Sequence, residues 1–160
     1  MVSKSLKSLK AISSLKIVFV PRRFPAGIIS EKVIIGQSLE GNDIWAFKVS
    51  DNPNENEDEP ELLLTGLIHA REPLSMMNIF YFVQLLAENY DSDPELNYLV
   101  NNREMWFIPV LNPDGYIYNE SIEPSGGGMH RKNRKDTGWL TNSPEIAEAV
   151  SKECNCTVKH

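Results

Sequence analysis

The 160-residue chain is 41% hydrophobic and 24% charged, with a mean hydropathy of -0.31, which is typical of one globular domain or part of one. Its formal net charge of -6, its pI of about 5.1 and the absence of a long Lys/Arg stripe argue against a nucleic-acid partner. Pro, Gly, Asn or charged residues interrupt every apolar stretch before the roughly 18 residues of a membrane span, so we expect no such span.

The first segment, residues 1–30, has no assignable pattern. It is rich in lysine, but its uninterrupted apolar part is only Ile17–Val20, shorter than the h-region of about 7 to 15 residues in a signal peptide. Either the protein is not secreted by this route or its true start is missing, and we assign no localisation.

A β-hairpin is predicted next. Glu31–Ile35 and Asp43–Ser50 are rich in Val, Ile, Phe and Trp, and GQSLEGND joins them with glycine and asparagine at the turn. The acidic, proline-bearing residues 51–61 follow. They lack the EF-hand spacing and its glycine, so we expect a solvated connection rather than a calcium site.

Alternating strands and helices are predicted after this loop. Glu61–Ile68 is a nearly uninterrupted apolar run of the kind that is buried on both faces of an α/β sheet. Pro73 suits a first helical turn, and Leu74–Tyr90 has core-filling apolar residues at helical spacing. Asp93–Asn101 predicts a shorter helix and Glu104–Leu111 another buried strand, which together indicate a parallel or mixed sheet covered by helices.

The C-terminal part begins with turn chemistry in NPDGY, residues 112–116. The glycine-rich, basic SGGGMHRKNRKDTG predicts a loop, and SPEIAEAVSKE, residues 143–153, predicts a short helix. Cys154 and Cys156 are too close for an unstrained bridge, so we expect free thiols or partners outside this chain.

A histidine and a glutamate stand three positions apart in TGLIHAREPLS, residues 65–75. The preceding strand would deliver His69 to the carboxyl-terminal edge of the sheet, where open α/β sheets place their ligand sites. Imidazole nitrogen and carboxylate oxygen are ordinary zinc ligands, so His69 and Glu72 could share one cation, although a catalytic zinc usually takes three protein ligands. By spacing alone, a surface histidine beside an Arg71–Glu72 ion pair is the simpler interpretation. Beside a metal, Arg71 would anchor a substrate.

Several segments together resemble one family. TGLIHAREPLS, NNREMWFIPVLNPDGYIYNE and GGGMHRKNRK, with IGQSLEG and SDNP, stand in the order found in the zinc metallocarboxypeptidases, peptidase family M14, which include the carboxypeptidase A, B and T types. The similarity runs from about Val33 to Thr137. It implies an α/β fold with a mixed, mostly parallel sheet flanked by helices. It also implies that residues 31–160 are the N-terminal portion of the catalytic domain, incomplete at the C-terminus.

The resemblance implies roles for four residues. His69 and Glu72 would be the first two zinc ligands, and Arg71 would line a substrate subsite. Arg134 would bind substrate and stabilise the oxyanion, because a guanidinium stabilises negative charge that develops as Zn²⁺ polarises the scissile carbonyl. The implied activity is zinc-dependent hydrolysis of C-terminal residues from peptides or proteins.

The family completes its site with four further groups, which lie downstream of RKNR. They are an Asn-Arg pair, a histidine that is the third zinc ligand, a tyrosine, and a glutamate that acts as general base. We expect the chain to end before them, because its last histidine, His160, is the terminal residue. The alternative function is therefore a truncated non-catalytic fragment or a pseudoenzyme that lacks the third zinc ligand and general base. The acylase and desuccinylase branch of the fold also uses HxxE, but NPDGY followed by RKNR disfavours it.

Three further expectations concern packing. Residues 112–116 would form a structural turn beneath the site. His130, where a tryptophan or similar large residue is expected, would be a surface or packing histidine rather than a ligand. Without their covering elements, Leu62–Ile68 and Met105–Leu111 would expose apolar surface or an open sheet edge.

Overall fold

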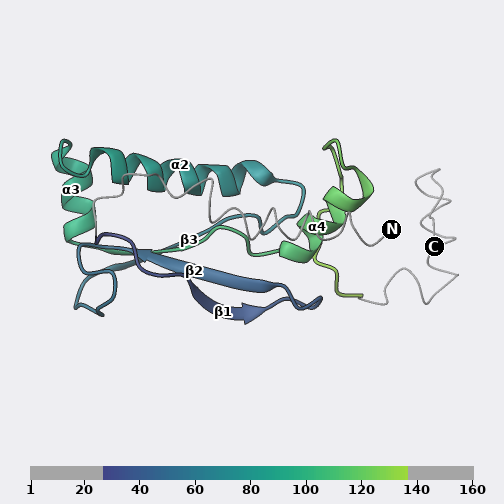
Figure 1. Cartoon of the computed structure of the whole chain (residues 1–160), viewed down its shortest axis with the longest axis horizontal. Helices are drawn as coiled ribbons and strands as arrows, with labels where there is room; N and C mark the ends of the chain where they lie inside the picture. Colours follow the sequence, from purple (N-terminus) through teal and green to yellow (C-terminus); the bar gives the residue numbers. More distant parts are fainter. Residues whose placement is uncertain (1–26, 137–160) are drawn as a thin grey trace, which may run out of the picture.

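The computed structural model describes residues 27–136 of the chain (Figure 1). In chain order these residues form β1 (Val33–Gln37), β2 (Asp43–Val49), β3 (Glu61–Thr65), α2 (Pro73–Asn89), α3 (Pro94–Asn101), β4 (Glu104–Ile108) and α4 (Pro113–Ile122). The strands make one sheet in the order β1-β2-β4-β3. β3 pairs with β4 in parallel, whereas the β1–β2 and β2–β4 pairs are antiparallel. The sheet is therefore mixed, as the sequence predicted, but among the described strands two of the three pairings are antiparallel, so this part of the sheet is not mostly parallel.

The predicted hairpin is confirmed by β1 and β2. Its connecting loop closes through a hydrogen bond from Ser38 N to Asn42 O at 2.8 Å and another from Gly41 N to Ser38 O at 3.1 Å. Gly41 has a φ of +80°, in the left-handed region that glycine enters at little cost. The loop therefore has a defined shape, and this shape becomes important at the candidate site.

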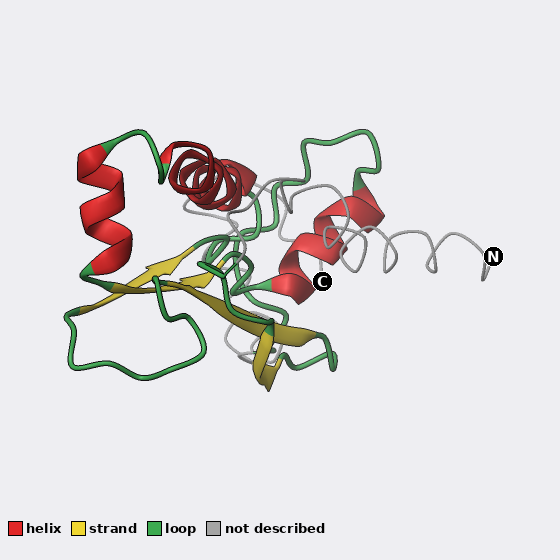
Figure 2. Ribbon diagram, turned by 60° about the vertical axis from the view of Figure 1, so that its left-hand side comes forward, coloured by secondary structure: helices red, strands yellow, loops and turns green. Residues whose placement is uncertain are grey.

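The two helices α2 and α3 cover one face of the sheet (Figure 2). Pro73 occupies the first turn of α2, and the residues of α2 that face the sheet are Met76, Ile79, Phe80, Val83, Leu86 and Ala87. Asp93 caps α3, because its carboxylate accepts hydrogen bonds from the backbone nitrogens of Glu95 and Leu96. Both predicted helices are confirmed, with the expected apolar stripe on α2.

The core lies between this pair of helices and the central strands. Phe47 and Val49 of β2 and Met105 and Phe107 of β4 alternate along their strands, so they share the face that α2 covers. The rings of Phe47 and Phe107 stack with their centroids 5.3 Å apart. Each of these side chains is at most 8% exposed, and each contributes about 1.5 to 3 kcal/mol of apolar burial.

The outer strand β3 is more exposed than its sequence suggests. Leu62 is 48% exposed and Leu63 is 61% exposed, because β3 lies at an edge of the sheet. The expectation of exposed apolar surface is confirmed here, and the interpretation of this strand as buried on both faces is wrong for the described residues. For β4 the exposure expectation is wrong: Met105 and Phe107 are 1% and 0% exposed, since β4 has a strand on each side and α2 above.

A helix, α4, begins where the sequence predicted only a turn. The side chain of Asn112 accepts a hydrogen bond from Gly115 N at 3.1 Å, and Pro113 occupies the first turn. Asparagine at the N-cap followed by proline begins a helix as readily as it forms a turn. The predicted turn is therefore the first turn of a helix. Gly115 has a packing reason, because a Cβ there would lie 2.6 Å from the Cβ of Ala70.

The predicted glycine-rich and basic loop is confirmed as far as residue 136. The predicted helix at residues 143–153, both cysteines and His160 lie outside the described residues, as do residues 1–26. Among the described helices, none has the length and apolar character that a membrane crossing requires.

Candidate functional site

The residues of the HxxE motif lie where the loops that follow two parallel strands run side by side. We call residues 66–72 the His69 loop. Its Gly66 donates to Ile108 O at 2.8 Å, and its Leu67 carbonyl accepts from Asn112 N at 3.1 Å, so the pairing of β3 with β4 continues beyond both strands. His69 therefore leaves the carboxyl-terminal edge of the sheet, as the sequence predicted.

The backbone of the His69 loop is held in a rare conformation. Leu67 is fully buried and has a φ of 50°, which is costly for a residue with a Cβ. Its nitrogen donates to Ser75 Oγ at 2.8 Å, and Ser75 Oγ donates to Glu72 O at 2.8 Å. The Asn112 amide donates to Ile68 O at 3.2 Å. The loop is thus shaped from both sides, by the start of α2 and by the cap of α4.

A buried asparagine of α4 joins the His69 loop to the segment that carries RKNR. We call residues 129–136 the basic loop. Asn119 is 7% exposed, and its Nδ2 donates to Ala70 O at 3.1 Å and to His130 O at 2.8 Å. Its Oδ1 accepts from His130 N at 2.9 Å, while Ala70 N donates to Arg131 O at 3.0 Å. Two segments far apart in the sequence are thereby fixed against each other.

His69 and Glu72 are brought together at the mouth of this arrangement. His69 Nδ1 lies 2.9 Å from Glu72 Oε2, and the two side chains are 36% and 49% exposed. The hydrogen bond from His69 is the largest influence on Glu72 and lowers its pKa. Burial is the next largest and raises the pKa, and the charges of Arg131 and Arg71 lower it further. Glu72 is therefore a carboxylate at neutral pH, which is the form that binds a metal.

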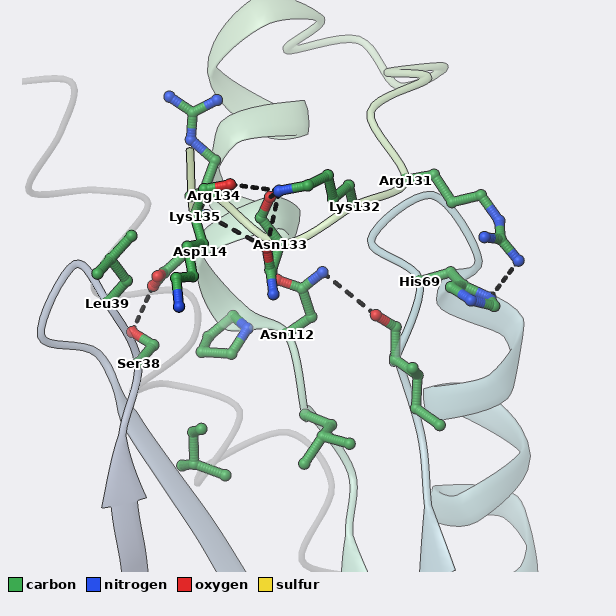
Figure 3. A pocket seen from close by; sticks show the side chains of 14 residues that line it. Ser38, Leu39, His69, Asn112, Asp114, Arg131, Lys132, Asn133, Arg134 and Lys135 are labelled. Atoms are coloured by element: carbon green, nitrogen blue, oxygen red, sulfur yellow. Dashed lines mark hydrogen bonds between the residues drawn. The ribbon is translucent and has the colours of Figure 1, made fainter. Parts of the chain in front are cut away.

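The guanidinium of Arg131 contacts the same two side chains. Its Nη2 lies 3.0 Å from His69 Nδ1 (Figure 3). Its Nε lies 3.6 Å from Glu72 Oε1. His69 Nδ1 cannot donate to Glu72 and accept from Arg131 at the same time, so the tautomer of the ring decides which contact is a hydrogen bond. No role for Arg131 was predicted from the sequence.

The two arginines for which the resemblance implied roles lie elsewhere. Arg71 is exposed, and its positive charge contributes to the lowered pKa of Glu72. Arg134 Nε donates to Glu40 Oε1 at 3.1 Å, and its guanidinium carbon lies 3.8 Å from the centre of the Tyr118 ring. Figure 3 shows Arg134 and His69 on opposite sides of the cavity.

A cavity of about 820 Å³ separates these two sides. Its lining comes from the hairpin loop, the two strand ends and the basic loop, and comprises Ser38, Leu39, Ile44, Ile68, His69, Leu111, Asn112, Pro113, Asp114 and residues 131–135. Two arginines and two lysines stand in that lining against one aspartate, and the aspartate is engaged in hydrogen bonds. The cavity therefore offers a net positive surface to a ligand.

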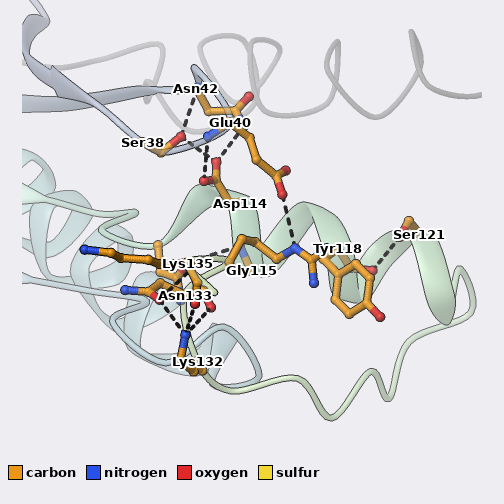
Figure 4. Close-up of polar contacts among 12 residues, drawn as sticks. Ser38, Glu40, Asn42, Asp114, Gly115, Tyr118, Ser121, Lys132, Asn133 and Lys135 are labelled. Carbon is orange, nitrogen blue, oxygen red and sulfur yellow. Dashed lines mark hydrogen bonds and ion pairs between the residues drawn. The ribbon is translucent and has the colours of Figure 1, made fainter. Parts of the chain in front are cut away.

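Asp114 fixes the hairpin loop at the rim of the cavity (Figure 4). It is 3% exposed, and it accepts hydrogen bonds from the Ser38 hydroxyl, from Glu40 N at 3.0 Å and from Asn42 Nδ2 at 2.8 Å. Burial opposes its ionisation, but these hydrogen bonds and the charge of Arg134 prevail and lower its pKa. The hairpin loop and α4, far apart in the sequence, thus form one wall.

The donor atoms of His69 and Glu72 are of the types that bind zinc. One imidazole nitrogen and one ionised carboxylate meet at hydrogen-bond distance, and both atom types are ordinary Zn²⁺ ligands. Within residues 27–136, no third His, Cys, Asp or Glu side chain joins them in a group that could hold a metal. The ring of His130 packs edge-on against Tyr118 at 5.0 Å, which supports the packing role predicted for it.

Comparison with known families identifies the family of the chain. The family model described as zinc carboxypeptidase matches residues 25–145. The chain belongs to the zinc carboxypeptidase family. A zinc carboxypeptidase of Saccharothrix mutabilis subsp. capreolus is 40% identical over 101 residues, which cover 63% of this chain and 23% of that protein. The chain thus spans about a quarter of the length of such a relative.

Solved structures of other proteins share the fold. The carboxypeptidase A of Helicoverpa armigera superposes with a TM-score of 0.58 at 26% identity, over 72% of this chain and 26% of that one. Thrombin-activatable fibrinolysis inhibitor superposes with a TM-score of 0.59 at 24% identity, over 84% of this chain and 30% of that one. The second likeness is one of fold alone.

Not every zinc carboxypeptidase homologue is named as active. The inactive metallocarboxypeptidase ECM14 of Saccharomyces cerevisiae is 32% identical over 117 residues, which cover 72% of this chain and 26% of that protein. Membership of the family therefore gives the fold and the class of chemistry, and the activity has to be argued from the residues themselves.

Proposed function

We propose that this chain supplies part of the active site of a zinc-dependent carboxypeptidase, which hydrolyses C-terminal residues from peptides or proteins. The observation that carries the proposal is the His69–Glu72 pair, in which two donors of the zinc type lie 2.9 Å apart at the carboxyl edge of the sheet. Membership of the zinc carboxypeptidase family supports it.

His69 and Glu72 would hold the ion. When bound, Zn²⁺ supplies Lewis acidity that polarises a carbonyl and lowers the pKa of water. The chain's contribution is to present an imidazole nitrogen and an ionised carboxylate, and the lowered pKa of Glu72 provides the latter. The Arg131 guanidinium would have to move from its contact with both donors, because two cations cannot share His69 Nδ1.

The cationic cavity supports a substrate with a free carboxylate. Arg131, Lys132, Arg134 and Lys135 place positive charge on its lining, and a peptide C-terminus carries the complementary charge. We assign substrate binding to Arg71 and Arg134, and stabilisation of the oxyanion to Arg134. Because Arg134 is held by Glu40 and stacks on a tyrosine, this role requires its release from the ion pair.

The test is hydrolysis by the protein that carries this chain. An N-blocked peptide with a free C-terminus is compared with its amidated counterpart, and release of the terminal residue is followed by chromatography. We expect faster release from the free acid, and loss of release by at least a hundredfold in His69→Ala and after chelation of zinc. His130→Ala is the matched control, because this histidine lies outside the metal pair. Undiminished release by His69→Ala would contradict the proposal.

A second candidate is a non-catalytic zinc-binding protein of the same family. Two observations favour it: the described residues supply two donors, and several homologues are named as inactive. The same experiment separates the two functions. Stoichiometric zinc binding that requires His69, without release from either peptide, would establish the second.

A further inference from the structure

Four cations of the basic loop form a row along the cavity. They belong to Arg131, Lys132, Arg134 and Lys135, and each of these residues lines the cavity. Figure 3 shows Arg131 beside His69 and Arg134 on the opposite side, with Lys132 between the two arginines. A ligand that extends across the cavity from His69 therefore passes several positive charges in succession.

The two arginines of this row are already paired with carboxylates. Arg131 Nε lies 3.6 Å from Glu72 Oε1, and Arg134 Nε donates to Glu40 Oε1 at 3.1 Å. A peptide C-terminus brings one further carboxylate, which is the group that the proposed function uses. With that carboxylate, three anions face two guanidinium groups, so the arginines leave no positive charge unmatched.

The two lysines of the row have a different environment. The ammonium of Lys132 contacts three neutral oxygens of its own loop: it donates to Asn133 O at 3.4 Å, to Asn133 Oδ1 at 3.1 Å and to the carbonyl of Lys135. These contacts hold the ammonium at the wall of the cavity without matching its charge. The backbone of Lys135 is held as well, because its nitrogen donates to Asn133 Oδ1 at 3.2 Å. The lysines therefore present positive charge on a segment of defined shape.

One acidic side chain stands in the lining among these cations. It is Asp114, and its carboxylate accepts hydrogen bonds from the Ser38 hydroxyl, from Glu40 N and from Asn42 Nδ2. The formal net charge of the whole chain is -6, so the long-range field of the chain does not attract an anionic peptide. A preference for acidic ligands would therefore arise locally, from the lysines of the basic loop.

The cavity has room for more of a peptide than its terminal residue. Its volume of about 820 Å³ is near the upper end of the roughly 300–1,000 Å³ that ligand sites span. A carboxypeptidase leaves one residue on the C-terminal side of the bond that it cleaves, so the rest of the bound peptide lies on the N-terminal side. Each extended residue spans about 3.3–3.6 Å. The residues just N-terminal to the scissile bond would therefore pass the basic loop.

We propose that Lys132 and Lys135 make the site selective for peptides with acidic side chains on the N-terminal side of the scissile bond. The inference rests on the proposed function, because it concerns the substrate of the same cavity. Hydrogen bonds between an ammonium and a carboxylate are about twice as strong as those between neutral groups. An acidic side chain that replaces the neutral oxygens around Lys132 is therefore favoured over a neutral one. Lysine suits this role because its flexible stem lets one point charge reach carboxylates at several positions.

The experiment compares two sets of peptides, Ac-Glu-Glu-Ala-X and Ac-Gln-Gln-Ala-X, in which X is Leu, Phe, Lys or Arg. Hydrolysis by the protein that carries this chain is measured at about 50 mM and about 500 mM NaCl. For each X that is released, we expect kcat/KM to be about fivefold or more higher for the acidic peptide at low salt, mainly through KM. At high salt the ratio should approach one, because salt screens the charges. Binding of dansyl-labelled forms to Glu72→Gln protein gives the same comparison without hydrolysis.

Variants of Lys135 separate its charge from its shape, because its contacts within the loop are made by its backbone. Lys135→Glu should bring the ratio to about one or below, whereas Lys135→Arg should keep the preference. Lys32→Ser is the matched control: this lysine is exposed, lies outside the cavity lining and should leave the ratio within twofold.

The outcomes separate this inference from the proposed function. A preference that persists in Lys135→Glu, or that Lys32→Ser loses to the same extent, would overturn the inference. Equal binding of the acidic and neutral sets by folded Glu72→Gln protein would overturn it as well, and circular dichroism shows whether each variant is folded. Preferential binding of the acidic set without hydrolysis of either set would refute the proposed function and uphold the selectivity of the cavity.

Discussion

The replacement Asp114→Asn tests how the wall of the cavity is held together. The Asp114 carboxylate accepts three hydrogen bonds from the hairpin loop at 3% exposure. An asparagine side chain has nearly the same shape as aspartate but carries no charge. Its NH2 group would replace one accepting oxygen and would face a hydrogen-bond donor of the hairpin loop. A hydrogen bond to a charged group contributes about 1.5 to 3 kcal/mol, and the burial cost of the charge offsets part of the sum. We expect a loss of about 2–4 kcal/mol at pH 7.

The pH dependence gives this prediction a sign. The pKa of Asp114 is lowered in the folded state, since its hydrogen bonds outweigh burial. Its contribution is therefore present above the unfolded pKa of about 3.9 and is lost as the pH falls through the folded value. Urea unfolding, followed by tryptophan fluorescence at pH 7, 5 and 3, should show the difference between wild type and variant shrinking below about pH 4. Asp91→Asn, at an exposed position, is the control. A difference below about 0.5 kcal/mol at pH 7, or one that persists undiminished at pH 3, would refute the reasoning.

Three other variants test separate contacts. Asn119→Ala removes the three hydrogen bonds that join the His69 loop to the basic loop. It should lower the free energy of unfolding by about 2–4 kcal/mol and weaken zinc binding, measured by titration, at least tenfold. Unchanged zinc affinity would show that these hydrogen bonds do not position the site. Lys48→Met leaves the Glu104 carboxylate buried without its ammonium partner, so chemical denaturation should show a loss of about 3–5 kcal/mol in the free energy of unfolding. The double variant Lys48→Met/Glu104→Leu should recover most of this loss. An equal loss in both variants would contradict the reasoning. Gly66→Ala places a Cβ 2.7 Å from a backbone carbonyl oxygen and should lower the melting temperature, whereas Gly36→Ala, with no atom within 4 Å, should leave it within about 2 °C.

Local patterns predicted the elements whose signals need no distant partner. Residue type, spacing and caps predicted the hairpin, α2, α3 and β4. At the helix starts, Asp93 caps α3 and Pro73 occupies the first turn of α2, which are the positions that these residue types favour. The position of His69 at the carboxyl edge also followed, because a strand before a helix directs its last residues there. These are properties of a single segment.

Properties that depend on neighbours could not be read from the sequence. An apolar strand such as β3 looks the same whether it is central or at an edge, and only the strand order shows that Leu62 and Leu63 are exposed. The contact of Arg131 with His69 joins residues 62 positions apart, and no spacing rule predicts it. The sequence likewise gave no signal that Asn119 would clamp two loops, because an asparagine late in a helix is ordinary surface composition.

The acidic loop, residues 51–60 between β2 and β3, illustrates the same limit. Its composition predicted a solvated connection, and most of its residues are exposed. Three of its carboxylates nevertheless converge, because the loop turns over the first residue of β4 and Glu57 N is held by Glu104. Convergence of this kind depends on the folded path, so a motif based on spacing misses it.

The most direct test of the central claim is isothermal titration of the protein that carries this chain with Zn²⁺, for wild type, His69→Ala, Glu72→Gln and the control His130→Ala. If His69 and Glu72 hold the ion, wild type and the control bind one Zn²⁺ with equal affinity, and both replacements in the pair weaken it at least a hundredfold. Zinc affinity that is the same in all four proteins would place the ion elsewhere and contradict the account.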